Sequence, residues 1–232
     1  MVDMNKRLFP LLAVFGALAL IGPSLASARI IDLGALDSVA KPGCPGTPCY
    51  AISRTTGYQT RNATSKAPMV VTRNGKIVAW TIALGKPTTK QIKFFDSKLG
   101  GEATAQLTIL SVTKKSKKTP KAKDGAVVSR QGETVKLKPY FGKTVQFALQ
   151  RSIPVKKGQI VALTVPTWAP ALATGLDSST VWNASRGEGQ CEDTQGQSSQ
   201  LAVKQFSDYY CKYTTARITY SAQIVSDPTP NR

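Results

Sequence analysis

Short runs in which apolar and polar residues alternate constrain the fold of this chain more than any other feature. The clearest run, Ala216–Ile224, places five apolar side chains on one face. Its other face carries polar side chains, namely Arg217, Thr219, Ser221 and Gln223. An alternation with a period of two residues predicts a β-strand that packs one face on a core and exposes the other to water.

Further strands are predicted along the rest of the chain. Gln159–Val165 is almost continuously apolar and β-branched, which favours a central position in a sheet. The shorter candidates are Tyr50–Ser53, Met69–Thr72, Gly75–Leu84, Gln91–Phe95, Ala105–Val112, Thr134–Lys138, Val145–Leu149 and Thr180–Asn183. After residue 28, the sequence shows no sustained helical period. We therefore expect an all-β fold, an antiparallel two-sheet sandwich that is jelly-roll-like, with about ten strands.

The N-terminus has the features of a secretory signal peptide over residues 1–28. Lys6 and Arg7 precede the apolar run Leu8–Ile21, and Ala26-Ser27-Ala28 is a small-residue cleavage site. The apolar run is shorter than the about 20 residues that a membrane span needs, so we expect no membrane span and a secreted, extracellular protein. We expect an N-terminal extension over 29–49, a single sandwich domain over 50–226 and a disordered tail over 227–232.

Four cysteines in an exported chain favour two disulfides over thiol chemistry. Cys44 and Cys49 flank a short segment of turn residues, so we pair them, and Cys191 then pairs with Cys211. The two other pairings remain open at this point. The spacing of Cys191 and Cys211 does not suit a zinc knuckle, and we expect no metal site.

The net charge and the absence of histidine limit the catalytic and metal-binding chemistry that this chain can perform. The 232-residue chain contains no His, which excludes Ser-His-Asp and Cys-His catalysis and histidine-based zinc sites. Its formal net charge is +18, and removal of residues 1–28 leaves 29 basic against 12 acidic residues, a net charge of +17. This charge favours acidic polymers as partners. We expect no cofactor.

A lysine-rich run is the candidate contact for polyanions. It contains Lys114, Lys115, Lys117, Lys118, Lys121 and Lys123 and reads as the loop of a long hairpin. Two interpretations stay open, a flexible cationic arm and a solvated hairpin tip without a specific ligand. The run lacks arginine and aromatic residues, so we expect no specific binding of nucleic acid.

Aromatic residues in the second half of the chain are the candidate contacts for a sugar. Trp168 lies between Pro166 and Pro170, where a stiff strand exit would suit an aromatic platform. Three further aromatic residues near the Cys191–Cys211 region complete the predicted ligand-binding set, namely Trp182, Tyr209 and Tyr210. The alternative for these rings is ordinary packing in the core or at its rim.

Two segments carry a resemblance to known proteins. Gly75–Thr81 together with Val155–Pro170 resembles a group of exported actinobacterial β-sandwich proteins. The resemblance covers most of the chain after residue 28. It implies an exported β-sandwich, and it brings no activity and no site residues with it.

These patterns predict an exported, non-catalytic binding or envelope-associated module that contacts a polyanionic or carbohydrate surface. One alternative is a lyase-type enzyme on acidic polysaccharide with a tyrosine base, for which Tyr209, Tyr210, Lys204 and Lys212 are the candidates. Another alternative is a structural or assembly subunit. The sequence predicts neither the ligand nor the oligomeric state.

Overall fold

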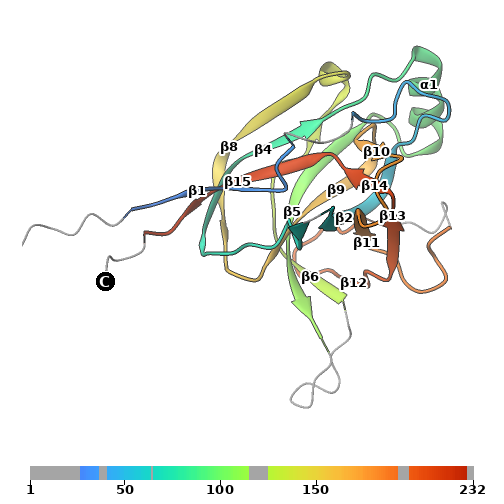
Figure 1. Ribbon diagram of the computed structural model, residues 1–232. Coiled ribbons are helices and arrows are strands. Elements are labelled where there is room, and N and C mark those ends of the chain that lie inside the picture. Colours follow the sequence, from blue (N-terminus) through green and yellow to red (C-terminus); the bar gives the residue numbers. More distant parts are fainter. Residues whose placement is uncertain (1–26, 37–40, 64, 115–124, 193–198, 229–232) are drawn as a thin grey trace, which may run out of the picture.

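The chain folds into an antiparallel β-sandwich, as the alternating runs predict (Figure 1). The computed structural model describes residues 27–36, 41–63, 65–114, 125–192 and 199–228. Most of the predicted signal peptide, five of the six candidate lysines and the last four residues lie outside these ranges. Within them the structure has fifteen strands and one α-helix, and several of the strands are only two to four residues long.

One layer is a four-stranded sheet in which β15 and β4 are central. Its order is β1 (Ile30–Leu33), β15 (Tyr220–Ser226), β4 (Gly75–Ala83) and β8 (Thr144–Val155). Every neighbouring pair in it is antiparallel. The strand next to the N-terminus thus pairs with the last strand of the chain, which brings the two ends of the described chain together (Figure 1).

The second layer is a nine-stranded, curled sheet. Its path runs through β12 (Phe206–Ser207), β6 (Gly125–Gln131), β5 (Thr104–Thr113), β9 (Ile160–Ala169), β2 (Ile52–Asn62), β11 (Val181–Ala184) and β13 (Cys211–Thr214). Two short strands attach beside this path, β3 (Ser65–Lys66) on β2 and β7 (Val135–Lys136) on β5. A 3-10 turn, Lys138–Tyr140, follows β7. The predicted strand Gln159–Val165 is confirmed as the central β9.

The predicted strand Ala216–Ile224 is divided at Thr219. Its first part, β14 (Ala216–Ile218), pairs with β10 (Leu172–Thr174) in a two-stranded ribbon, and its second part is β15. The polar face was expected in water, but Arg217 is only 3% exposed and Thr219 is fully buried. The Arg217 Nη2 donates to the carbonyl oxygens of Gly34 and Ala35, each at 2.8 Å, and the Thr219 hydroxyl donates to the Ala83 carbonyl at 2.7 Å.

A helix replaces the predicted strand Gln91–Phe95. This helix, α1 (Thr89–Lys98), lies at one end of the sandwich (Figure 1). The Thr88 hydroxyl accepts from the Gln91 backbone N–H, and the Gln91 side chain accepts from the Thr88 N–H, which forms a capping box. After the helix, Gly100 has a φ of +93°, a conformation that glycine adopts without strain. These local hydrogen bonds outweigh the β-like composition of Ile92–Phe95.

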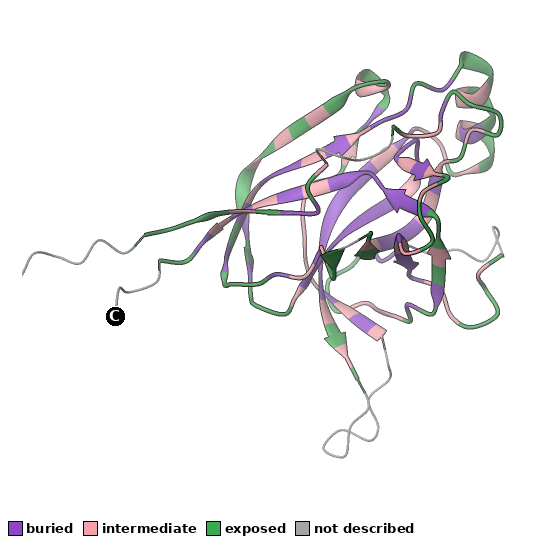
Figure 2. Cartoon of the chain, viewed as in Figure 1, coloured by how far each residue is buried: buried purple, intermediate pink, exposed green. Residues whose placement is uncertain are grey.

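The interior lies between the two sheets, where buried residues concentrate on β5, β9 and β15 (Figure 2). Tyr220 of β15 is 1% exposed, and its hydroxyl donates to the Val161 carbonyl of β9 at 2.8 Å. This hydrogen bond joins the two sheets across the core. Within the described ranges, no helix combines the length and apolar character needed to cross a membrane.

Replacing Tyr220 with Phe should lower the free energy of unfolding by about 1 kcal/mol, because a buried hydrogen bond is lost while the ring still packs. Urea denaturation measures the change. Tyr140→Phe is the matched control, since the hydroxyl of this half-buried tyrosine makes no hydrogen bond within the described part of the chain. Equal losses in the two variants would contradict a stabilising role for the bond between the sheets.

Candidate functional site

The Cys191–Cys211 disulfide organises the edge of the nine-stranded sheet. Both predicted pairs are confirmed, Cys44 with Cys49 and Cys191 with Cys211. Disulfides of this kind persist in oxidising compartments outside the cytoplasm. Cys211 begins β13, the outermost strand, so its bond holds the segment around Cys191 against this edge. Hydrogen bonds from Arg186 and Tyr213 also hold the segment around Cys191 against this strand.

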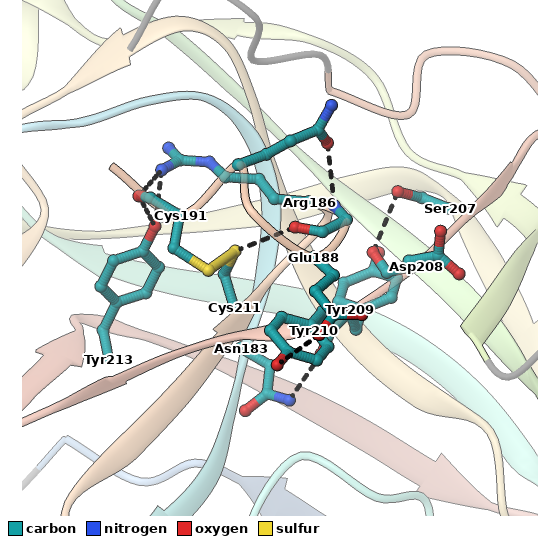
Figure 3. The surroundings of a disulfide bond; sticks show 12 residues. Asn183, Arg186, Glu188, Cys191, Ser207, Asp208, Tyr209, Tyr210, Cys211 and Tyr213 are labelled. Carbon is teal, nitrogen blue, oxygen red and sulfur yellow. Dashed lines mark hydrogen bonds between the residues drawn. A yellow bond between two sulfur atoms is a disulfide. The ribbon is translucent and has the colours of Figure 1, made fainter. Parts of the chain in front are cut away.

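Arg186 and Tyr213 clamp the segment around Cys191 to β13. The Arg186 Nη1 donates to the Cys191 carbonyl at 3.0 Å and to the Tyr213 hydroxyl at 2.6 Å. That hydroxyl donates in turn to the Cys191 carbonyl at 2.7 Å (Figure 3). Burial raises the pKa of Tyr213, although the Arg186 charge opposes this shift. The Tyr213 ring is therefore held in one orientation as a neutral phenol.

Tyr213 stacks on Trp182 across neighbouring strands. The two residues are direct partners in the β11–β13 register, and their ring centroids lie 4.5 Å apart with an interplanar angle of 24°. Trp182 is 5% exposed and packs inward near Gly57, where an added Cβ would come within 3.0 Å of its ring. The rigid core thus supports Trp182, and Trp182 supports the more accessible Tyr213.

An open groove of about 410 Å³ lies beside this stack. Tyr50, which follows Cys49 directly, contributes a third aromatic ring and is 49% exposed. The other lining residues come from the β10–β14 ribbon, the turns beside it and the last residue of β13, namely Leu172, Thr174, Gly175, Thr214, Thr215 and Ala216. None of the residues that line the groove in the described ranges carries a charge.

Each disulfide lies close in sequence to an aromatic residue that lines this groove, Cys49 before Tyr50 and Cys211 before Tyr213. The Gly43 N–H donates to the Leu172 carbonyl at 2.9 Å, which ties the Cys44–Cys49 loop to β10. Tyr213 lies two residues after Cys211. The aromatic side chains at the two walls are therefore preorganised, which reduces the entropy lost when a ligand binds.

The structure separates the four aromatic residues of the predicted ligand site. Trp182 lines the groove, whereas Tyr209 is buried and donates its hydroxyl to the Gln200 side chain. Tyr210 is exposed and donates to a Glu188 carboxylate oxygen at 3.2 Å. In Figure 3 these two tyrosines lie to the right of the disulfide and Tyr213 lies to its left. Tyr209 and Tyr210 therefore do not line the groove beside the Trp182–Tyr213 stack.

Trp168 is not a platform, and that prediction is wrong. The side chain is fully buried, and its Nε1 donates to Asp96 Oδ1 at 2.9 Å and to the Gly101 carbonyl at 3.0 Å. Its ring also packs 4.8 Å from that of Phe95. These partners belong to α1 and the turn that follows it. The composition of Gln91–Phe95 predicted a strand there, so the helix that covers Trp168 was not expected.

The two lysines of the tyrosine-base candidates do not converge on one site, and most of the polyanion-binding lysines lie outside the described residues. Lys114 is exposed after β5, and Lys115, Lys117, Lys118, Lys121 and Lys123 lie outside the described residues. The backbone N–H of Lys204 donates to Val128 of β6, whereas Lys212 is on β13. Four strands of the nine-stranded sheet lie between β6 and β13. Lys204 and Lys212 therefore belong to different parts of the molecule.

Two lining residues, Tyr50 and Tyr213, were not selected from the sequence. Both lie within two residues of a predicted disulfide cysteine, and Tyr213 shares the period-two face of Cys211. That proximity is the signal that could have identified them. The described residues contain no group of three or more His, Cys, Asp or Glu side chains positioned to hold a metal ion.

No family model, curated protein or solved structure matches this chain. The resemblance to exported actinobacterial β-sandwich proteins therefore stays a prediction, and the function must be argued from the geometry.

Replacing Trp168 with Ala should lower the free energy of unfolding by about 3–5 kcal/mol, since a large buried aromatic side chain is removed. Trp168→Phe should cost less, because it keeps a ring against Phe95 while losing the two Nε1 hydrogen bonds. Tyr210→Ala is the control at an exposed ring and should have little effect. Chemical denaturation measures all three, and an unchanged stability of the Trp168→Ala variant would refute the buried placement.

Proposed function

We propose that this protein is an exported, non-catalytic module that binds carbohydrate through the groove between Tyr50 and the Trp182–Tyr213 stack. The observation that carries the proposal is an uncharged, aromatic-lined groove on a chain with a formal net charge of +18. A site for an acidic ligand would be expected to use some of that charge. Its absence from the lining residues that the structure describes favours a neutral ligand face.

The chemistry of the lining suits a sugar ring. The C–H face of a pyranose is apolar and packs against the flat face of an aromatic side chain, while its hydroxyls need hydrogen-bond partners. Tyr50 and Tyr213 supply aromatic surface, and Thr174, Thr214 and Thr215 supply hydroxyls that can both donate and accept. Small-molecule sites typically combine such an apolar lining with a few polar groups.

Export is the second part of the proposal. Ala26-Ser27-Ala28 supplies a cleavage site, and the two disulfides are of the type found outside the cytoplasm. The sandwich begins earlier than the predicted boundary at residue 50, because β1 (Ile30–Leu33) pairs with β15 in the four-stranded sheet. The Cys44–Cys49 loop then leads directly into Tyr50 at the groove. A secreted module with this charge would also be retained near acidic envelope polymers.

The lyase alternative finds less support. A tyrosine base is most effective when its pKa is lowered toward neutrality. Here burial, assisted by Tyr58 and Tyr220, raises the pKa of Tyr209 well above its usual value. The hydrogen bond to Glu188 raises the pKa of Tyr210 as well. Both shifts make the phenolate form scarcer, so a non-catalytic role is the better proposal.

The intact mass of the exported protein should correspond to residues 29–232, because cleavage is expected after Ala28. Mass spectrometry of the protein recovered outside the producing cell measures this directly. Recovery of a chain that begins upstream of Leu25 would contradict the signal-peptide assignment. Retention of the whole chain inside the cell would contradict export.

A glycan array with the purified protein should identify neutral glycans as ligands. Tyr50→Ala should then weaken binding about 3- to 10-fold, the effect of losing one aromatic contact. Tyr50→Phe keeps the ring and should bind nearly as the unaltered protein does. Tyr210→Ala removes an exposed tyrosine outside the groove and should have no effect.

Affinity for the neutral glycan should change little between low and high salt, since no charged side chain lines the groove in the described ranges. Isothermal titration at the two salt concentrations measures it. A steep loss of affinity with salt, or full binding by Tyr50→Ala, would overturn the proposed groove.

A further inference from the structure

A second groove, of about 310 Å³, lies where strands from the two sheets approach each other. One wall is β6, which contributes Ser129, Arg130 and Gln131, and the other is β8. The β8 residues in the lining are Arg151, Ser152, Ile153 and Pro154, and Val203 closes the groove from the segment before β12. It shares no lining residue with the aromatic groove.

Both walls are β-bulges. In β8, the four residues Leu149–Ser152 stand opposite the single residue Val78 of β4, between the pairs Ala148–Ala79 and Ile153–Ile77. In β6, Ser129 is an extra residue between the pairs that Val128 and Arg130 make with β5. Bulges re-aim side chains and are common beside functional sites. Here each of the two irregular segments contributes a serine and an arginine to the same groove.

In the described part of the chain, neither Arg130 nor Arg151 has a carboxylate partner. Among the residues that the structure describes, the ion pair within 4.0 Å joins Lys136 to Glu102, and neither Arg130 nor Arg151 takes part in it. Neither guanidinium makes a hydrogen bond within the described ranges, in contrast to Arg217, whose Nη2 binds two backbone carbonyls. Two like charges that line one groove repel each other, and an anion between them would relieve that repulsion.

We propose that this groove binds the carboxylate or sulfate groups of an acidic polysaccharide. A guanidinium presents a planar fork of N–H donors that matches a carboxylate or sulfate in a bidentate manner. The Ser152 hydroxyl at the same wall can donate a further hydrogen bond. The lysine-rich sequence between β5 and β6 contains no arginine, so the groove offers bidentate donors that this sequence does not.

The lining favours a polysaccharide over a nucleic acid. Proteins that bind single-stranded nucleic acid stack bases on aromatic side chains, in addition to neutralising the phosphates. The described residues that line this groove include no aromatic ring. Arginine forks and hydroxyls alone suit a chain of acidic sugars, whose charged groups recur along the polymer.

The test compares two double variants that remove the same charge. Arg130→Gln with Arg151→Gln alters the groove, whereas Lys90→Gln with Lys93→Gln alters exposed residues of α1, which lines neither groove. The probes are polygalacturonate and dextran sulfate, with neutral dextran as the blank. The arginine pair should lose about tenfold or more in affinity for at least one acidic probe, since two charge-assisted contacts disappear.

The lysine double variant should also lose affinity, but the logarithm of its fold-change should be less than about a third of that of the arginine double variant. The reason is that it changes only the long-range electrostatic field. Arg130→Lys with Arg151→Lys keeps the charge but loses the bidentate fork, so it should restore affinity only in part. Thermal unfolding of each variant confirms that it is folded before affinities are compared. Equal losses in the arginine and lysine pairs would overturn the assignment.

Two further measurements distinguish this groove from the aromatic groove, and a polysaccharide ligand from a nucleic acid. Tyr50→Ala should leave the acidic probes bound as before, so failure of the aromatic groove and failure of this groove give different results. A single-stranded oligonucleotide should bind without dependence on Arg130 and Arg151. If the arginine pair instead weakens the oligonucleotide and not the acidic polysaccharides, the polysaccharide assignment is wrong.

Discussion

Burial of both faces of the segment Ala216–Tyr220 is the constraint on which the rest of the structure depends. Tyr220 joins the two sheets, and Thr219 binds the end of β4. Arg217 holds the chain at Gly34 and Ala35, although burial lowers its pKa and disfavours its charge. Ala216 forms part of the aromatic groove. One segment near the C-terminus thus positions the N-terminal strand, the interior and the candidate site.

The two grooves differ in the chemistry of their linings. The aromatic groove lies near two disulfides, one at the edge strand β13 and one in the loop that bonds to β10, and its lining is uncharged in the described part of the chain. The arginine groove is built where β6 and β8 leave regular pairing, and its charges have no acidic partner among the described residues. Rigid cross-links suit recognition by shape, whereas bulges suit the presentation of long charged side chains.

The sequence around α1 contains local signals for a helix, although the composition of the segment predicted a strand. Thr88 and Gln91 have the spacing of a capping box, and Gly100-Gly101 marks the end of the helix. The β-like run Ile92–Phe95 predicted a strand instead. That one error led to a second, because α1 supplies Asp96 and Phe95 to the pocket that buries Trp168. Local capping decided the structure of this segment because its hydrogen bonds form without any distant partner.

The sequence by itself determined the fold class, the central strand β9 and both disulfides. Period-two alternation reports which face of a strand is buried, and cysteine spacing reports which pairs can close short loops. Neither pattern reports which strands become neighbours. Only the tertiary structure decided the unequal sheets, the division at Thr219 and the placement of Tyr50 and Tyr213 at one groove. These features depend on contacts between residues far apart in the chain. Such contacts produce no periodic pattern in the local sequence.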